Sequence, residues 1–485
     1  MLRRRRNRAK TCRVRSVPSR HSGVFITALA VLAALSACSN GAPDTTASSA
    51  ESSPVPTTPD ASRPAITTPS SVPSSTAGHA STTAALPAAA EPTTRTLRVP
   101  ADFATVQSAV DAALPGDLVL IAPGDYAEAV TVRTPSIVIR GEDRNKVILD
   151  GGDALENGIL VAADNVAVEN LTVRRFAVNG LLFTKAYDDN VDDPADHEVL
   201  QGYRASYVTA SNNGLYGIYS FFARGGVIEH SYASGHSDSG FYVGQCKPCD
   251  AVLRDNIAEL NAVGYEGTNA SGNLFVLSSI WRRNRVGVTP NSQNMERLAP
   301  QGDTVIAGNL VEENQDPGAP SAGQGGSGLG IAVGGGERNR VLRNLVRGNV
   351  NAGIVVTDLA GYQPSANEVR ENVLSDNGVD LALYASDGAP TVPARSNCFS
   401  GNRFESSLPP SIETVVGCPI SGPGATTTAI ASGLLTLQPG APNVDYRNVS
   451  LPPSQPSMPD ALSTRRVPAS AAVPVVDLST ITVPS

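Results

Sequence analysis

A glycine followed by a short apolar run recurs along the middle of the chain. Neighbouring glycines of this kind are mostly 22 to 24 residues apart, and the runs after them, such as GIYSF and GIVVT, are rich in branched side chains. Such runs predict β-strands, and a repeat of this length predicts coils that stack on one another. The repeat glycines are Gly158, Gly180, Gly217, Gly240, Gly264, Gly287, Gly330 and Gly353.

A second signature, Asn-x4-Asn, follows many of these glycines. Stacked coils place like residues above one another about 4.8 Å apart, so recurring asparagines are expected to form ladders in which each amide bonds the next coil. The pattern predicts a parallel β-helix of roughly nine or ten coils. A leucine-rich repeat has a similar period but needs a leucine framework that is absent here. The pairs are Asn256/Asn261, Asn309/Asn314, Asn344/Asn349 and Asn372/Asn377, with Ser279 and Asn284 in the equivalent places.

The first 37 residues have the composition of an export signal. They contain nine Lys and Arg and no acid, then an apolar run over 24–34, and end at Leu-Ser-Ala before Cys38. The apolar run is shorter than the roughly 20 residues of a membrane-spanning helix, so it predicts secretion. Leu-Ser-Ala-Cys resembles a bacterial lipobox, which implies cleavage before Cys38 and a lipid on its sulfur. We expect a bacterial lipoprotein exported to the outer face of the cytoplasmic membrane.

Composition divides the rest of the chain. Residues 38–96 are nearly all Ser, Thr, Pro and Ala with no apolar periodicity, which predicts a disordered linker after the lipidated cysteine. Residues 97–420 contain the repeats and are predicted to form the β-helix. Residues 421–485 return to Pro, Ser and Thr and are expected to form an extended tail, laid along the solenoid.

The charge of the exported part excludes one class of partner. The chain has 37 Lys and Arg against 45 Asp and Glu, and nine of the bases lie in the signal. What remains is strongly acidic and repels phosphate backbones. Nucleic-acid binding is therefore not expected.

Four of the six cysteines remain once the signal and the lipidated Cys38 are set aside. Export favours disulfides, and three pairings are possible. Proximity along the chain favours Cys246 with Cys249 and Cys398 with Cys418. The alternative for the Cys-Lys-Pro-Cys segment is a redox pair or half of a metal site, which needs two further ligands.

The segment after the linker carries the most specific likeness. Residues 98–142 resemble the first coils of pectin methylesterases, including a G-x-Y-x-E element at Gly124, Tyr126 and Glu128. Together with the repeat, residues 97–405 resemble right-handed parallel β-helix proteins of the pectin-lyase-like superfamily. The resemblance implies an all-β fold, a single right-handed parallel β-helix, and a polysaccharide substrate.

A short helix is expected at the start of this segment. Asp102 is expected to cap it, and the apolar side chains that follow lie on one helical face. Pro115-Gly116 ends it. Such a helix covers the open end of the first coil, where unpaired strand edges invite aggregation. The G-x-Y-x-E element is therefore interpreted as structural.

The catalytic motifs of the related enzymes are missing. The sequence lacks the Q-D-T, D-F-x-F-G and G-R-P-W motifs of pectin methylesterases, the N-T-D, G-H-G and R-I-K motifs of polygalacturonases, and the D-P-H motif of mannuronan epimerases. The D-D element of polygalacturonases has a counterpart only at Asp188-Asp189, which is expected in a loop and not on a coil. Gly235-His236-Ser237 keeps only a fragment of the polygalacturonase set. A fold alone does not define an activity, so candidate residues must be sought on the coils themselves.

The coils suggest one candidate surface. The residue after each repeat glycine is apolar and is expected to face the core, so the next residue faces outward. Tyr219, Tyr242 and Glu266 then form an exposed column, and aromatic rings of this kind pack on the apolar faces of sugars. The alternative is a solvent-facing sheet whose tyrosines stack for stability. Further ligand-binding residues expected nearby are Gln245, Asn269 and Arg224.

Candidate catalytic residues lie beside this column. Asp238 and Glu266 are on successive coils, and glycoside hydrolysis needs two carboxyl groups about 5–9.5 Å apart. His236 is expected to carry a proton and Tyr242 to position the sugar. These residues favour a polysaccharide lyase, epimerase or hydrolase, while a non-catalytic module that binds a glycan or an envelope protein is the alternative. A copper-handling role, by resemblance to β-helix proteins that assemble copper sites, is least favoured because His and Met are few.

An acidic insertion over 185–202 interrupts the repeat. Clustered carboxylates can bind calcium, although most such runs are solvated loops. No resident cofactor is otherwise expected. We expect a monomer whose partner is a polysaccharide or cell-envelope glycan and which meets the membrane only through its lipid. The insertion contains Asp188, Asp189, Asp192, Asp193, Asp196, His197 and Glu198.

Overall fold

A computed structural model gives the conformation of most of the chain after the linker. The export signal, Cys38, almost all of the linker and most of the acidic insertion lie outside the described residues. The structure describes residues 94–185, 198–294, 297–321, 326–386, 389, 391–419, 429–431 and 435–485.

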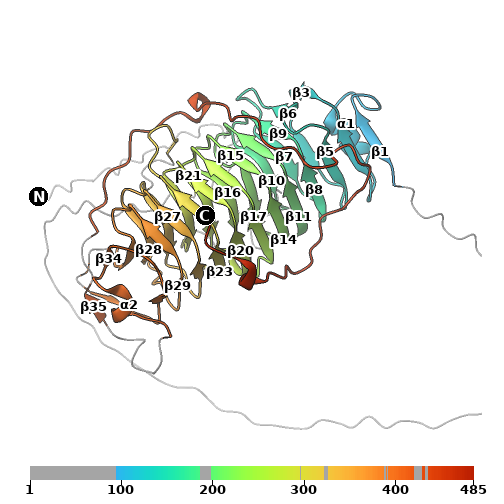
Figure 1. Cartoon of the computed structure of the whole chain (residues 1–485). Helices are drawn as coiled ribbons and strands as arrows, with labels where there is room; N and C mark the ends of the chain where they lie inside the picture. The colour runs from blue at the N-terminus through green and yellow to red at the C-terminus, as the bar shows by residue number, and fades with distance from the viewer. Residues whose placement is uncertain are drawn as a thin grey trace, which may run out of the picture.

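The described chain winds into a solenoid built from three parallel β-sheets (Figure 1). A typical coil gives one strand to each sheet, and each strand pairs with its equivalents in the coils before and after it. The longest sheet has 12 strands, so the solenoid is longer than the sequence predicted. The coils that no repeat glycine marks lie at both ends of the solenoid, before Gly158 and after Gly353.

We name the three sheets A, B and C. Sheet A has 12 strands in the order β1 (Thr96–Val99), β2 (Leu118–Ile121), β5 (Val138–Gly141), β8 (Val166–Glu169), β11 (Leu200–Ser206), β14 (Ala223–Glu229), β17 (Ala251–Arg254), β20 (Ser271–Leu277), β23 (Gly302–Ala307), β26 (Arg340–Leu342), β29 (Glu368–Arg370) and β33 (Cys398–Ser400). Sheet B has 10 strands: β3 (Gly124–Tyr126), β6 (Val147–Asp150), β9 (Thr172–Arg174), β12 (Thr209–Ser211), β15 (Tyr232–Ser234), β18 (Ile257–Glu259), β21 (Ile280–Arg282), β24 (Leu310–Glu312), β27 (Leu345–Arg347) and β30 (Val373–Ser375).

Sheet C has 11 strands and carries the repeat glycines. They are β4 (Val130–Val132), β7 (Asn157–Val161), β10 (Asn179–Phe183), β13 (Ile218–Phe221), β16 (Ser239–Gly244), β19 (Val263–Thr268), β22 (Val286–Asn291), β25 (Leu329–Gly334), β28 (Ala352–Thr357), β31 (Leu381–Tyr384) and β34 (Ser407–Leu408). A small antiparallel pair, β32 (Thr391–Pro393) and β35 (Ala429–Ala431), lies outside the solenoid sheets.

The repeat glycines are required by the close stacking of coils in sheet C. A Cβ atom on Gly217 would lie 2.5 Å from the carbonyl oxygen of Gly240 on the next coil, and one on Gly264 would lie 2.5 Å from that of Gly287. Real Cβ atoms do not approach a backbone oxygen so closely. The glycine at this position therefore follows from the backbone of the neighbouring coil.

Corners between the sheets explain the asparagine signature. A single residue with positive φ turns the chain, such as Asp255 (φ 54°) between β17 and β18 and Leu260 (φ 58°) after β18. The next residue, Asn256 or Asn261, points inward and is fully buried. Its amide oxygen accepts a hydrogen bond from a backbone N–H of the preceding coil, and its NH2 group donates to a backbone carbonyl of that coil.

Both predicted ladders are confirmed, and each is longer than the sequence suggested. One ladder is Ser231, Asn256, Ser279, Asn309, Asn344, Asn372 and Asn402. The other is Asn213, His236, Asn261, Asn284, Asn314, Asn349 and Asn377. A third ladder, which the sequence reading missed, joins Gln301, Asn339, Asn367 and Asn397.

The first coil is capped by α1 (Val106–Ala112). The N-cap is Thr105, in a capping box with Ser108, so the prediction of Asp102 as the cap was wrong. Asp102 instead accepts from the backbone N–H of Arg98. The carboxylate of Glu128 accepts from the first two backbone N–H groups of α1, at 2.9 and 3.0 Å, which gives the G-x-Y-x-E element a structural role.

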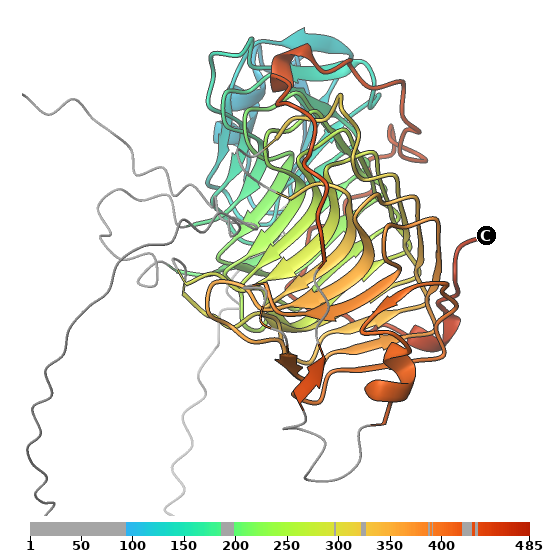
Figure 2. The ribbon, with the colours of Figure 1, turned by 90° about the vertical axis from the view of Figure 1, so that its left-hand side faces the viewer.

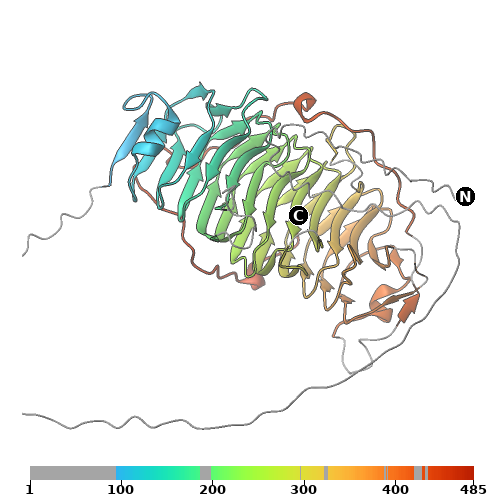
Figure 3. The ribbon, with the colours of Figure 1, turned by 180° about the vertical axis from the view of Figure 1, so that it is seen from behind.

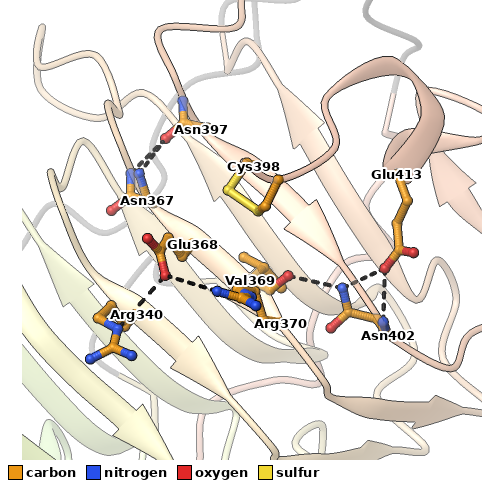
Figure 4. The surroundings of a disulfide bond; sticks show 10 residues. Arg340, Asn367, Glu368, Val369, Arg370, Asn397, Cys398, Asn402 and Glu413 are labelled. Carbon is orange, nitrogen blue, oxygen red and sulfur yellow. Dashed lines mark hydrogen bonds and ion pairs between the residues drawn. A yellow bond between two sulfur atoms is a disulfide. The ribbon is translucent and has the colours of Figure 1, made fainter. Parts of the chain in front are cut away.

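The last coil is closed by a disulfide and a short helix, α2 (Ile412–Val415). Cys398 is bonded to Cys418, as predicted. Figure 4 shows the surroundings of this bond, where Asn402 ends its ladder by donating to Glu413 Oε1 at 2.8 Å. The carboxylate takes the place that the next asparagine would have occupied.

The C-terminal tail lies on the solenoid in two legs. The first leg, 435–458, runs back from the last coils to the first (Figure 2). Leu435 and Leu437 pack on the apolar outer face of sheet C, which includes Val355. Its backbone carbonyls accept from side chains along the way, among them Arg285 and Asn212. This leg contains a 3-10 turn, η2 (Tyr446–Asn448).

The second leg, 459–485, returns along sheet A (Figure 3). Arg140 on β5 donates to the carbonyls of Ser463 and Arg465. The leg then passes a 3-10 turn, η3 (Leu478–Thr480), where Leu478 packs on apolar side chains at the outer face of the sheet. The C-terminal tail thereby contacts coils that lie far apart along the solenoid.

Candidate functional site

The predicted column exists as a stack across sheet C. Tyr219 on β13 pairs with Tyr242 on β16, which pairs with Glu266 on β19. The residues before them, Ile218, Phe241 and Tyr265, are fully buried in the core. The alternation that was read from the sequence therefore places these side chains as predicted.

The expectation that the column is exposed was wrong. Tyr242 is 1% exposed and Glu266 2%, while only Tyr219 is half-buried. The ring of Tyr242 lies along its own strand, so that a Cβ on Gly244 would lie 2.3 Å from it. These side chains point away from the core but are not exposed, because neighbouring aromatic rings cover the outer face of sheet C at this point.

Tyrosine rings cluster at this point. The ring of Tyr216, in the turn before β13, lies 4.4 Å from that of Tyr219 and 5.1 Å from that of Tyr242. Tyr219 and Tyr242 meet edge to face at 4.8 Å, and Phe221 lies 5.5 Å from Tyr219. Tyr216 was missed because it precedes the repeat glycine and so had no place in the column.

The two nominated carboxyl groups meet behind these rings. Ser239 Oγ lies 2.9 Å from Asp238 Oδ1 and 2.9 Å from Glu266 Oε2. A hydroxyl has one proton to donate, so contact with both carboxyl groups requires one of them to be protonated. Both side chains are buried.

The surroundings decide which carboxyl is protonated. Burial, and then the adjacent charge of Glu266, raise the pKa of Asp238 well above its ordinary value, against opposing hydrogen bonds from Ser239 and Tyr216. Glu266 is held by donors instead: Asn291 Nδ2 and Thr268 Oγ1 lie 3.0 and 3.1 Å from its Oε1. Asp238 is therefore the member that holds a proton, while Glu266 accepts hydrogen bonds from these donors. Burial and nearby acids, first Asp238, also raise the pKa of Tyr216.

His236 does not belong to this site. It replaces an asparagine in the second ladder, where its Nδ1 lies 2.7 Å from Asn261 Oδ1 and its Nε2 lies 3.1 Å from Asn213 Nδ2. Burial lowers its pKa to about 4, although the bond to Asn261 opposes the shift. Both ring nitrogens are engaged, so the interpretation of His236 as a proton carrier is corrected to a ladder residue.

The three further ligand-binding candidates also lie elsewhere. Gln245 and Asn269 have positive φ at the corner after sheet C, and Asn269 Nδ2 donates to the carbonyl of Gln293. Arg224 lies on β14 of sheet A and donates to Gln201 Oε1. Position along the chain suggested proximity to the column, but the corner separates these side chains from it.

The predicted disulfide at the Cys-Lys-Pro-Cys segment is present, joining Cys246 to Cys249. Among the described residues, no group of three or more His, Cys, Asp or Glu side chains is arranged to hold a metal ion. The acidic insertion proposed for calcium falls largely on residues 186–197, outside the described part. No helix in the described ranges is long and apolar enough to cross a membrane.

The solenoid is the part of the chain that is similar to known proteins. A family model for the right handed beta helix region matches residues 200–361, and no curated protein matches the chain. The A-module of mannuronan C-5 epimerase AlgE6 from Azotobacter vinelandii is similar at 16% identity and a TM-score of 0.42, over 62% of this chain and 92% of that one. A pectate lyase is similar at 16% identity and a TM-score of 0.37, over 72% and 88% of the two chains.

An alginate lyase from Paenibacillus is similar at 16% identity and a TM-score of 0.35, over 64% of this chain and 97% of the lyase. The architecture of this chain is established by its own sheets and by the family match. The parallel pairing of sheets A, B and C and the family match in the central coils agree on its type. This chain folds as a right-handed parallel β-helix.

Proposed function

We propose that this protein is an exported, lipid-anchored β-helix that processes a polysaccharide at Asp238 and Glu266. The observation that carries the proposal is a pair of buried carboxyl groups that both contact Ser239 Oγ beside a cluster of tyrosine rings, with burial raising the pKa of one of them, Asp238. Chemistry at a glycosidic centre needs one group that gives a proton and one that takes a proton or attacks. Asp238 is assigned the first role and Glu266 the second.

The separation of the two groups narrows the reaction class. The two oxygens that contact Ser239 Oγ are at most about 6 Å apart, which is closer than the carboxyl groups of inverting glycosidases, where a water needs room between them. A lyase or epimerase would use the same pair, with Glu266 removing a proton from the sugar ring and Asp238 supplying one.

Substrate would approach over the half-exposed rings. Tyr219 and Phe221 are the partly exposed members of the cluster, and aromatic faces of this kind pack on the apolar faces of sugar rings. A sugar seated there lies next to Tyr242 and the carboxyl pair. The partner is accordingly a polysaccharide or cell-envelope glycan.

A second candidate function is favoured by the burial of the pair. Asp238 is 4% exposed and Glu266 2%, so reaction requires the rings in front of them to move. A protein that binds a glycan over Tyr219 and Phe221 without turnover needs no such movement. In this case the carboxyl pair is a structural element of sheet C.

The experiment offers a panel of uronate polymers, neutral glucans and purified envelope glycan to the complete chain. New reducing ends, unsaturated uronates and inverted C5 centres are measured separately. If the proposal holds, Asp238→Asn and Glu266→Gln each lose at least about 100-fold in turnover, while glycan binding and the thermal unfolding midpoint are kept. Asp111→Asn on α1, an exposed carboxylate at the first coils and several coils away from β16 and β19, is the control. Binding by the wild type without turnover selects the second candidate.

Turnover should depend on pH through the protonated member. Because burial raises the pKa of Asp238, it remains an acid at pH values where an exposed aspartate is ionised. Turnover should therefore be highest below this raised pKa and fall as the pH rises through it. The falling limb should be absent from the residual activity of Asp238→Asn; an unchanged limb in that variant would assign it to another group.

Anchoring is tested at Cys38. Cys38→Ala removes the sulfur that would carry the lipid, so labelling with a lipid precursor should disappear and the protein should be released from the membrane fraction. Retention of the variant in that fraction would contradict the lipoprotein proposal. Cys12→Ala, within the predicted signal, is the matched control and should behave as the wild type.

A further inference from the structure

The outer face of sheet B presents an apolar column across six coils. Its members stack in register from β15 to β30. All but the first are half-buried rather than covered. At about 4.8 Å per coil, the column is roughly 24 Å long. It consists of Tyr232, Ile257, Ile280, Leu310, Leu345 and Val373.

A polar column runs beside it, two residues further along each strand. Its four central members alternate in charge, and ion pairs of 2.8 Å join Arg282 to Glu259 and Arg347 to Glu312. Serine stands at each end, on β15 and β30. The column reads Ser234, Glu259, Arg282, Glu312, Arg347 and Ser375.

This order is complementary to its own reverse. Consider two copies that meet face to face about a two-fold axis that runs parallel to the strands and lies between β21 and β24. The order of the coils in the second copy is then reversed, while each column still lies opposite the same column of the other copy. Arg282 then faces Glu312 of the second copy, and Glu259 faces Arg347. The apolar columns meet along the same line. We propose that the outer face of sheet B is an interface between two copies of this chain.

The corner residues on either side support the same arrangement. After the strands, Arg283 on one copy faces Glu313 on the other. Before them, Asp255 lies opposite Arg343, whose guanidinium also donates to the tail carbonyls of Leu478 and Ile481. Each of the four corner residues has positive φ and stands at the edge of the face. Within the central four coils, the arrangement brings no two like charges opposite each other, whereas like charges in apposition would cost affinity.

The other two-fold orientation does not fit. A two-fold axis along the solenoid would place each coil against the equivalent coil of the second copy. The apolar column of one copy would then lie against the charged column of the other. Ile257 would then face Glu259, and the apolar side chains would gain no apolar partner. The pattern therefore selects the antiparallel arrangement, which is the isologous contact of a two-fold dimer.

The remaining faces already have apolar cover within the chain. Leu435 and Leu437 pack on sheet C, and Leu478 packs on sheet A. The tail meets sheet B at its first coils, for instance where the carbonyl of Gln455 accepts from Asn145 before β6. A face this narrow belongs to the small, reversible class of interfaces, so the dimer should dissociate on dilution. Our sequence-based expectation of a monomer is replaced by this proposal.

The test is sedimentation velocity of the complete chain over a range of concentrations, in a detergent that keeps a lipid anchor soluble. The wild type should shift from monomer to dimer as concentration rises. Arg282→Glu and Glu312→Arg each place like charges opposite one another twice, and each should weaken the dimer at least about tenfold. An equal mixture of the two variants restores every opposite pair, so it should form heterodimers.

The matched control is Arg338→Glu at the corner before β26 of sheet A, which breaks a comparable exposed ion pair with Asp303 away from the proposed face. It should leave the dimer unchanged. Circular dichroism of each variant checks that the coils remain folded. A wild type that stays monomeric at every concentration overturns the proposal. Equal loss in the control, or a mixture that does not associate, overturns the antiparallel pairing.

Discussion

One position in the repeat has two different environments in sheet C. In the coils of β13 to β19 it is Tyr219, Tyr242 and Glu266, while in β25 and β28 it is Ala332 and Val355. The backbone, the register and the repeat glycine are the same in both regions. The difference lies wholly in what covers the side chains.

The later region depends on the tail. Ala332 and Val355 form an apolar strip that is packed by Leu435 and Leu437. The earlier region instead satisfies itself, because tyrosine rings pack against each other and the Glu266 carboxylate takes bonds from Asn291 and others. A solenoid face can therefore be closed by an apolar segment or by its own polar network, and only the second leaves reactive groups inside.

The largest effect that separates the regions is expected at Tyr242. Tyr242→Ala removes a buried ring on which two other tyrosines pack, and should destabilise the protein by about 3–5 kcal/mol, the range for a buried aromatic residue. Val355→Ala, at the same position under the tail, removes two methyl groups and should cost about 1–3 kcal/mol. Both are read from denaturant unfolding curves.

An exposed column would predict a different effect of Tyr242→Ala on stability. An outward residue in water leaves no cavity, so Tyr242→Ala would then change stability by less than about 0.5 kcal/mol. Equal midpoints for the wild type and Tyr242→Ala would show that the tyrosine cluster is open in solution. The comparison between the two regions would then be wrong.

The next effect concerns the ladders, which both regions share. Asn344→Leu breaks the side-chain bonds to Asn309 and Asn372 and leaves the buried backbone N–H of Asn309 without its acceptor. The expected loss of stability is about 1–3 kcal/mol. Asn448→Leu, on an exposed turn of the tail, is the matched control and should change the unfolding midpoint little. A loss as large in the control would mean that leucine itself, rather than the broken ladder, is responsible.

The fold could be predicted because its causes lie in single coils. A glycine is needed wherever the next carbonyl lies too close for a Cβ, as at Gly217, and an asparagine is needed wherever a corner buries an amide, as at Asn256. Because these requirements recur from coil to coil, glycine and asparagine recur in the sequence with the period of the coil. The helix cap was misassigned because Asp102 and Thr105 are both good caps by residue type, and the position of Glu128 decides between them.

The site could be predicted only in part, because burial depends on segments far away in the sequence. Asp238 and Glu266 meet because of the register, which the repeat reveals. The burial of Tyr242 also needs Tyr216, which lies outside the repeated position. His236 was misread because a histidine that replaces a ladder asparagine has the same spacing as a catalytic one. Only its two bonds, to Asn213 and Asn261, distinguish the two.

The smallest effect tests the cover itself. Leu437 is half-buried on the strip that contains Val355, so Leu437→Ser exposes part of an apolar face and should cost about 1 kcal/mol. Leu451 lies in the same leg but is 56% exposed, and Leu451→Ser should change stability by less than about 0.5 kcal/mol. Because only the later region depends on the tail, hydrogen exchange should quicken in β28 of Leu437→Ser and stay unchanged in β16. Faster exchange in both strands would mean that the tail stabilises the whole solenoid, and a polar network alone would then be insufficient to close the earlier coils.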